Sequence, residues 1–206
     1  TALSADWSAL SLNGPHARDV LASCTDADLS NAGFRWLSAQ EITVGGYKLW
    51  ALRMSYAGEL GWEFHGPREA ILDAFRALKA AGKAHGLANY GSFAMNAMRM
   101  EKGFLHWKSD ILTEFDPFEH RLDRFVKLES KDFVGKEALL DRVEQGPRKT
   151  LVTLRIDATH APAHGGASLM QDGKVVGTVT SGDWGHRVGM NLAYAFVDPA
   201  LASGAF

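Results

Sequence analysis

The sequence predicts an α+β fold, in which an antiparallel sheet carries helices on one face and is followed by a small C-terminal antiparallel β-barrel. Three observations predict this fold. A glycine pair interrupts an alternating run at residues 41–54, two segments at 67–82 and 91–103 place apolar residues at helical spacing, and the chain beyond residue 147 alternates like strands. With 206 residues, the chain is long enough for one large or two small domains.

The first elements are read from their turn residues. GPHARDVLASC, residues 14–24, predicts a short helix because Pro15 suits a first helical turn. EITVGGYKLWALRM predicts a hairpin around Gly45-Gly46, since paired glycines tolerate the positive φ of a tight turn. The chain should then be extended over 50–56, turn, and resume extension at 62–64.

Two longer helices should follow and cover the sheet. Residues 67–82 and 91–103 each carry apolar residues on one helical face and end near a glycine, Gly82 and Gly103. The side chains expected to point inward are Ile71, Ala74, Phe75 and Leu78 in the first helix, and Phe93, Ala94, Ala97 and Met98 in the second.

The residue pattern of the sequence changes near Ser130. Residues 129–147 predict a linker with a short helix, and strands are expected at 150–156, 167–182 and 191–199, with a tight hairpin at Asp172-Gly173. The predicted domains are 1–128, which contains part of a first domain whose N-terminal portion is missing, and 148–206, a barrel that is itself expected to be truncated. The chain begins with Thr1 and stops inside SGAF, so we expect a piece of a longer protein.

Composition disfavours several classes of protein. Hydrophobic residues make up 46% and charged residues 22%, which is typical of a globular protein rather than a disordered one. The net charge of -2 leaves no basic surplus for nucleic acid. The single cysteine, Cys24, rules out an internal disulfide and favours a reducing compartment. No apolar run reaches the roughly 20 residues that cross a bilayer, so we expect no membrane partner and a bacterial cytoplasmic or mitochondrial matrix location.

Common cofactor motifs do not occur in the sequence. There is no GxGxxG for FAD or NAD and no GxxxxGK[ST] for a nucleotide phosphate. His160 and His164 are four residues apart, but Pro162 between them prevents one regular helix from presenting both, so no metal site is expected. A GxSxG nucleophile elbow is also missing.

The stretch SYAGELGWEF, residues 55–64, is the best candidate for chemistry. Gly58 and Gly61 should let the backbone turn so that Tyr56 and Glu63 converge over one cleft. A carboxylate held there suits a flat heterocycle with an amino group beside a ring N–H, because two parallel donors match two carboxylate oxygens. The alternative is a turn carboxylate that only caps neighbouring backbone.

Five blocks of the sequence resemble one family. S-Y-A-G-E-L-G-W-E resembles the Y-[TAMV]-G-E-x-G-x-E signature of the glycine cleavage system T protein superfamily, the tetrahydrofolate-dependent aminomethyltransferases. WSALSLNGPHARDVL, AMNAMRMEKGF, SKDFVGKEALL and DGKVVGTVTSGDWGHRVGMNLAYAFVDP are similar to further blocks of that family, in the same order. The details look most like the folate domains fused behind FAD-dependent dimethylglycine and sarcosine dehydrogenases and oxidases. Where the stand-alone T protein has a folate-contacting arginine, this chain has Ala94-Met95-Asn96.

The resemblance implies roles for individual residues. Tyr56 and Glu63 match the pterin contacts, with Glu63 accepting hydrogen bonds from the amino group and the adjacent N–H. Glu59 is expected to hold its turn. Arg99 is expected first to pair with a buried carboxylate and second to contact folate. Arg187 is expected to meet the glutamate tail of folate, from the loop that also carries Trp184 and His186.

The activity implied is one-carbon transfer. An iminium made from an N-methyl amine is attacked by a tetrahydrofolate nitrogen, which requires orientation of both reactants and a base. The family's catalytic aspartate lies upstream of Thr1, so no catalytic residue is expected in this chain, and FAD is expected only in a missing N-terminal domain. The chain by itself should be weakly active or inactive.

Two other readings remain open. One is a folate-dependent demethylase without flavin, of the dimethylsulfoniopropionate type. The other is a non-catalytic folate-binding relative that assists iron-sulfur cluster assembly. That relative carries K-G-C-Y-x-G-Q-E where this chain reads KGFLHWKSDI.

Overall fold

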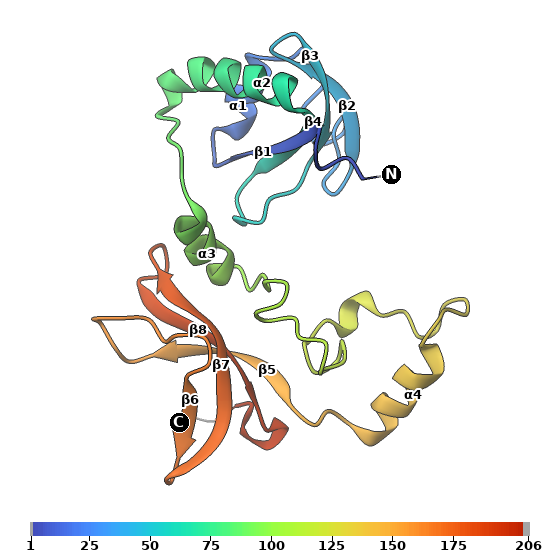
Figure 1. The fold of residues 1–206 in the computed structure, drawn as a ribbon, viewed down its shortest axis with the longest axis vertical. Helices are drawn as coiled ribbons and strands as arrows, with labels where there is room; N and C mark the ends of the chain where they lie inside the picture. Colours follow the sequence, from blue (N-terminus) through green and yellow to red (C-terminus); the bar gives the residue numbers. More distant parts are fainter. Residues whose placement is uncertain (1, 204–206) are drawn as a thin grey trace. The chain divides into compact units, whose positions relative to one another are not determined.

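The computed structural model describes residues 2–203 and divides the chain into two compact units, the first ending at Met95 and the second beginning at Asn96. The boundary falls inside helix α3 (Ser92–Glu101). Each unit contains one four-stranded antiparallel sheet (Figure 1).

The sheet of the first unit is built from strands β1 (Trp7–Asn13), β2 (Ala39–Val44), β3 (Tyr47–Leu52) and β4 (Gly61–Pro67), in the order β1-β4-β3-β2. The predicted hairpin is confirmed as β2 and β3. Its turn residues Gly45-Gly46 have φ values of 60° and 93°, and residues with a Cβ seldom adopt this backbone conformation.

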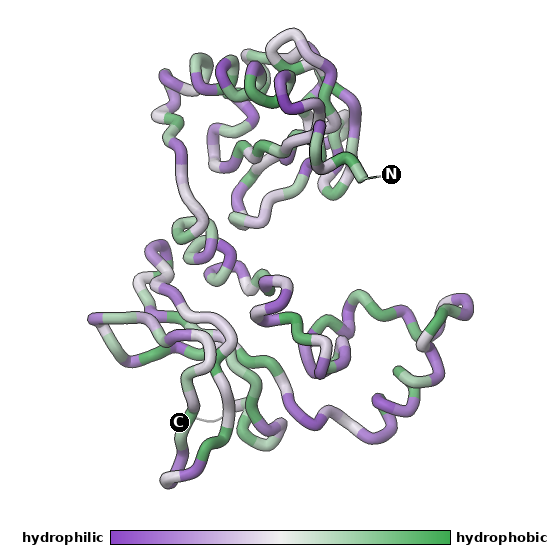
Figure 2. Tube along the Cα trace, viewed as in Figure 1, coloured by the Kyte–Doolittle hydropathy of each residue, from purple (hydrophilic) through white to green (hydrophobic). Residues whose placement is uncertain are grey.

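Helices α1 (Ala17–Ala22) and α2 (Arg68–Ala81) confirm the predicted helices, and α2 packs against β1, β3 and β4 (Figure 1). Figure 2 shows hydrophilic and hydrophobic residues interspersed along α2, and its buried residues recur at helical spacing, as in an amphipathic helix. Its buried residues are Ala70, Ile71, Ala74 and Leu78, whereas Phe75 is only half-buried. A 3-10 turn, η1 (Gly82–His85), follows α2 directly.

Strand alternation supplies the other half of this core. Trp62 and Phe64 of β4 and Leu49 and Ala51 of β3 are almost wholly buried on the face that α2 covers. Burial of each large apolar side chain stabilises the fold by roughly 1.5–3 kcal/mol. The residues between them in sequence must point to the opposite face.

The first unit differs from the sequence-based expectations at two places. Trp7–Asn13, for which no element was predicted from the sequence, is a strand, β1, and it pairs with β4 along its whole length. The extension predicted over 50–56 ends as a strand at Leu52, because the chain before Ala39 turns and only Arg53 still exchanges backbone hydrogen bonds with it, at Leu37 and Ser38.

The second unit has strands β5 (Thr150–Ile156), β6 (Ser168–Gln171), β7 (Lys174–Gly185) and β8 (Met190–Val197), in the order β5-β8-β7-β6. The predicted strands and the Asp172-Gly173 turn are confirmed. In the described part of the chain no pairing joins β5 to β6, so the hydrogen-bonded sheet is open and not a closed barrel.

Helices α3 and α4 (Lys136–Gln145) confirm the two remaining predicted helices, but the buried face of α3 differs from the prediction. Its buried residues are Ala97, Arg99 and Met100, whereas Phe93 is 89% exposed and Ala94 is exposed. The physical reason is that only the part of α3 from Asn96 onward belongs to the second unit, where Met100 packs in the apolar cluster.

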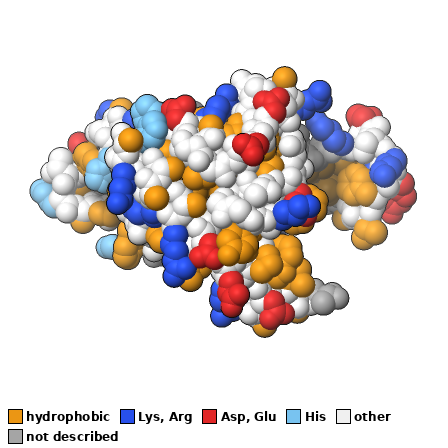
Figure 3. All heavy atoms as spheres, turned by 90° about the horizontal axis from the view of Figure 1, so that it is seen from above, with side chains coloured by type: hydrophobic (Ala, Val, Ile, Leu, Met, Phe, Trp, Pro, Cys, Tyr) orange, Lys and Arg blue, Asp and Glu red, His pale blue; other side chains and the backbone are white. Residues whose placement is uncertain are grey.

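Two short 3-10 turns complete the second unit, η2 (Asp123–Phe125) and η3 (Pro199–Leu201). None of the helices within residues 2–203 has the length and apolar character that a membrane crossing requires. On the face drawn in Figure 3, Lys and Arg side chains are interspersed with Asp and Glu side chains.

Candidate functional site

The face of the first sheet that α2 does not cover carries Glu63. Because Trp62 and Phe64 point into the core, alternation directs Glu63 and its neighbour His65 to the other face. In the strand register, Glu63 stands opposite Ser11 of β1 and Leu52 of β3. We call this surface the open face of the first sheet.

The Glu63 carboxylate has no hydrogen-bond donor within the described residues. Its side chain is 29% exposed, and its Oε2 lies 3.6 Å from Nε2 of His65, beyond hydrogen-bond distance. His65 Nε2 is itself shielded from solvent without a hydrogen-bond partner. A half-buried carboxylate prefers bonded donors, so Glu63 is available to accept hydrogen bonds from a ligand. The alternative was that Glu63 only caps nearby backbone, but within the described residues no backbone N–H donates a hydrogen bond to its carboxylate.

Two apolar side chains are neighbours of this carboxylate in the strand register. Trp50 stands opposite His65 in the register and is 45% exposed, and the half-buried Leu52 stands opposite Glu63. Neighbouring side chains on one sheet face lie within reach of one another. The open face therefore combines a hydrogen-bond acceptor with an indole ring, which suits a flat heterocycle carrying N–H donors.

Tyr56 and Glu59 lie in the loop that connects β3 to β4. Both are half-buried, and each has a contact within the chain. Gly58 between them has a φ of 71°, which confirms the tight turn predicted there. Tyr56 thus lies in the loop that leads into β4, the strand that carries Glu63, and its pterin contact stays a prediction.

Gly61 has a different function from the turn that the sequence suggested. It lies within β4, opposite Asn13, and a Cβ at this position would lie 2.2 Å from Asn13 Oδ1 and 2.7 Å from the Leu12 carbonyl oxygen. The glycine is needed because the Asn13 side chain lies over it. Asn13 in turn donates a hydrogen bond to the Tyr90 hydroxyl.

In the second unit, Arg99 is 1% exposed and forms an ion pair with the fully buried Asp110. Its guanidinium also donates to Asn96 Oδ1, the Phe104 carbonyl and Ser181 Oγ. These bonds occupy all five guanidinium N–H groups. The prediction that Arg99 pairs with a buried carboxylate therefore agrees with the structure. The folate contact stays a prediction, and it would require one of these N–H groups to change partner.

An irregularity in β7 brings two hydroxyls to Asp110. Adjacent residues of a regular strand face opposite sides, yet Thr180 Oγ1 and Ser181 Oγ both donate to Asp110 Oδ1 at 2.6 Å. The register between β7 and β8 shifts between Val179 and Ser181, so a bulge at Thr180 turns both side chains to one side. Sequence reasoning missed Asp110 and its hydroxyl partners.

The loop that carries Arg187 is held by Glu101. Glu101 Oε1 accepts hydrogen bonds from the backbone N–H groups of Arg187, at 2.6 Å, and of Val188, at 3.1 Å. The Arg187 and His186 residues are exposed, and Trp184 is half-buried. Arg187 belongs to the second unit, and its contact with a folate tail stays a prediction.

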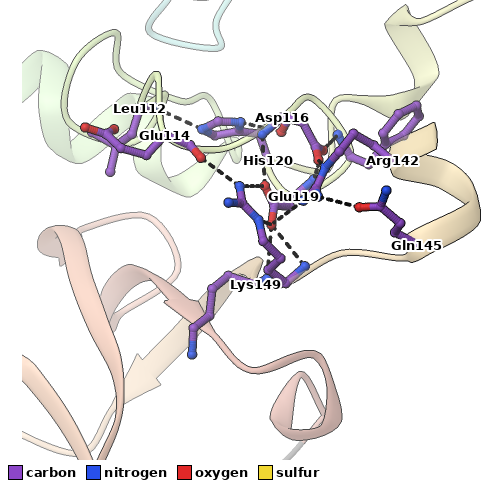
Figure 4. A network of polar contacts seen from close by, with 10 residues as sticks. Leu112, Glu114, Asp116, Glu119, His120, Arg142, Gln145 and Lys149 are labelled. Carbon is purple, nitrogen blue, oxygen red and sulfur yellow. Dashed lines mark hydrogen bonds and ion pairs between the residues drawn. The ribbon is translucent and has the colours of Figure 1, made fainter. Parts of the chain in front are cut away.

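A second buried acid, Glu119, lies at the centre of the network in Figure 4. Arg148 donates to both of its oxygens, through Nε at 3.0 Å and Nη2 at 2.9 Å, and the backbone N–H groups of Asp116, Arg148 and Lys149 donate as well. Burial alone would raise the pKa of Glu119, but these hydrogen bonds outweigh it and lower the pKa to about 2. This network fixes the segment before β5, and no local sequence pattern indicated it.

Comparison with known protein families decides the family. The family model described as "GCVT N-terminal domain" matches residues 1–130, and the model described as "Glycine cleavage T-protein C-terminal barrel domain" matches residues 149–205. The chain belongs to the glycine cleavage T-protein family. The resemblance read from the five sequence blocks is confirmed.

Relatives within the T-protein family include two kinds of enzyme. The chain is 39% identical to mitochondrial sarcosine dehydrogenase of Mus musculus and 38% identical to mitochondrial dimethylglycine dehydrogenase of Homo sapiens, over 96% and 94% of its length and 22% of each relative. It is 34% identical to an aminomethyltransferase of Streptomyces coelicolor, over 96% of its length and 53% of that protein. The chain thus spans about a fifth of the dehydrogenases and about half of the aminomethyltransferase.

A solved T-protein structure has the same fold. The aminomethyltransferase T of the glycine cleavage system from Bartonella henselae matches with a TM-score of 0.81 and 27% identity, over 94% of this chain and 52% of that one. The α+β fold class predicted for the chain is confirmed. The domain boundaries at 128 and 148 stay predictions, because compactness divides the chain at Met95 instead.

Proposed function

We propose that the chain binds tetrahydrofolate on the open face of the first sheet and acts in one-carbon transfer, as the C-terminal portion of an FAD-dependent N-methyl amine dehydrogenase or oxidase. The observation that carries this proposal is the Glu63 carboxylate, which is half-buried beside Trp50 and has no donor within the described residues. A half-buried acceptor left open in this way is suited to a ligand that brings its own N–H groups.

Glu63 would accept two parallel hydrogen bonds, from the pterin amino group and the adjacent ring N–H. Trp50 and Leu52, its neighbours on the open face, would contact the flat ring, and Tyr56 would approach from the β3–β4 loop. Bound tetrahydrofolate supplies the nitrogen that takes up the one-carbon unit. These residues would therefore orient the folate, which is one of the two reactants that the reaction requires to be oriented.

The dehydrogenase assignment rests on similarity. The dehydrogenases named above are more similar to the chain than the Streptomyces aminomethyltransferase, and Ala94-Met95-Asn96 departs from the arginine-containing sequence of the stand-alone T protein. The one-carbon donor would be an iminium derived from an N-methyl amine, and FAD and the catalytic aspartate would belong to parts of the protein outside residues 1–206. Both dehydrogenases are named as mitochondrial, which supports a mitochondrial matrix location in a eukaryote.

The test is calorimetric titration of tetrahydrofolate into the chain and into Glu63→Gln. The amide of the variant would offer one oxygen and an unwanted N–H donor in place of two acceptor oxygens, so affinity should fall by roughly 1.5–3 kcal/mol, the scale of a charged hydrogen bond. Glu41→Gln is the matched control, because Glu41 stands opposite Trp50 on the same face of the same sheet and already pairs with Lys48.

The proposal expects Glu41→Gln to bind as the unchanged chain does. Equal affinity of Glu63→Gln and the unchanged chain would remove Glu63 from the site. Equal weakening in both variants would show a general effect of charge on this face rather than a specific contact. Absence of tetrahydrofolate binding to the chain and to the longer protein that contains it would overturn the proposed function.

A further inference from the structure

Three side chains with metal-binding atoms converge on the surface of the first unit. His16 occupies the N-cap position of α1, Asp19 lies in the first turn of that helix, and His85 ends η1, far along the chain. One ligand atom from each lies within 4.8 Å of the others, and all three residues are exposed. This is a 2-His-1-carboxylate group contributed by two separate elements.

The fold explains why these residues meet. Helix α2 packs against α1 in the core, and η1 follows α2 without a gap, so the end of η1 returns to the start of α1. The rings of His16 and His85 have their centroids 5.3 Å apart at an angle of 35°, and His16 Nδ1 lies 3.1 Å from Asp19 Oδ2. The juxtaposition is thus set by packing of the helices and not by sequence neighbours alone.

We propose that His16, Asp19 and His85 form a binding site for a divalent transition metal ion of the zinc, cobalt or nickel type. Two imidazole nitrogens and one carboxylate oxygen are a donor set that these metals accept, with water completing the coordination. Bonds of about 2.0–2.2 Å to a tetrahedral ion place donor atoms about 3.3–3.6 Å apart. The His16–Asp19 pair is already near that spacing, and a ligand atom of the exposed His85 lies within 4.8 Å of both, so His85 would have to move closer to complete the site.

The site has few competing uses for its atoms. Within the described residues the His85 imidazole makes no hydrogen bond, and its ring contact is with His16. Because all three side chains are exposed, a bound ion would keep part of its water shell, and neither the ion nor the Asp19 carboxylate would have to be buried in the protein. A bound ion would tie η1 to α1 and would therefore stabilise the first unit in proportion to its occupancy. The sequence reading missed the site because it considered only histidines close together in the chain.

The test is calorimetric titration of the metal-free chain with ZnCl2, together with thermal unfolding with and without zinc. We expect one equivalent of zinc per chain and a higher Tm in its presence. His16→Gln, Asp19→Asn and His85→Gln should each weaken binding at least tenfold and abolish the Tm increase. His164→Gln, which alters an exposed histidine of the second unit, is the matched control and should behave as the unchanged chain.

Two further measurements keep the outcome interpretable. Circular dichroism checks that each variant is folded, and the titration is repeated with Cys24→Ser, because the half-buried thiol is another zinc ligand. Co²⁺ should give visible absorption bands that are lost in His85→Gln. Zinc binding that persists in all three site variants, that disappears in Cys24→Ser, or that is absent from the unchanged chain would overturn the proposal.

Discussion

The carboxylate of Asp110 accepts a hydrogen bond from the guanidinium of Arg99, and the two side chains are 0% and 2% exposed. Two charges removed from water persist only when each is paired and fully hydrogen-bonded. Asp110 meets this requirement through Thr180, Ser181 and the His106 backbone N–H. The pair thus joins α3, the loop after it and strand β7 inside the second unit.

Asp110→Asn should strongly destabilise the second unit. The substitution keeps the size of the side chain but leaves the Arg99 charge buried without its counter-ion, and we expect a loss of about 3–5 kcal/mol in the free energy of unfolding. Urea denaturation followed by circular dichroism measures it. Asp123→Asn, at an exposed aspartate of η2, should change stability by less than about 0.5 kcal/mol. Identical midpoints for the two variants would contradict the prediction.

Acid should remove the contribution of Glu119 to stability. The pKa of Glu119 in the folded chain is about 2 against an ordinary value of 4.5, so its contribution is fully present above pH 4.5 and is lost as the pH falls from 4.5 towards 2. The shift corresponds to about 3 kcal/mol. Urea unfolding of the unchanged chain and of Glu119→Gln at pH 7 and pH 3 should show a smaller pH dependence in the variant.

A matched substitution separates this effect from general charge. Glu129→Gln removes an exposed carboxylate and should leave the pH dependence of unfolding as it is in the unchanged chain. The assignment to Glu119 fails if both glutamine variants lose the same amount of pH dependence.

Gly61→Ala should destabilise the first sheet. The new Cβ would overlap Asn13 Oδ1 and the Leu12 carbonyl, and the strands must shift to admit it, at a cost of roughly 1–3 kcal/mol. Asn13→Ala introduced together with Gly61→Ala should recover only part of the loss, since the Leu12 carbonyl remains. Gly91→Ala, where nothing lies within 4 Å of the new atom, is the control. A lower Tm for Gly91→Ala than for Gly61→Ala in thermal unfolding would refute this account.

Glu101→Ala should loosen the loop that carries Arg187. The backbone N–H groups of Arg187 and Val188 would lose their acceptor, so their hydrogen exchange should accelerate by about tenfold or more, as expected for a lost charged hydrogen bond. Exchange followed by NMR or mass spectrometry reports this directly. Glu144→Ala, on the exposed side of α4, should leave these amides unchanged, and acceleration in both variants would point to global destabilisation.

Local chemistry in the sequence determined most secondary structure. Gly45-Gly46 and Asp172-Gly173 fix tight turns through positive φ, and the helical spacing of apolar residues in 68–81 fixes α2, because these preferences act between near neighbours. β1 was not predicted, because its strand character depends on pairing with β4, which lies far along the chain. The inward face of α3 was misjudged at Phe93 because periodicity does not tell which part of a helix meets a core.

The sequence alone determined the family, since four further blocks accompany, in order, the signature that contains Tyr56 and Glu63. Strand alternation with Trp62 and Phe64 then directs Glu63 to the other face. Only the tertiary structure decided which groups surround that carboxylate, which carboxylate forms an ion pair with Arg99, and that His16 and His85 lie side by side. Those contacts join residues far apart in the chain, and they arise from packing of whole elements, which local preferences do not encode.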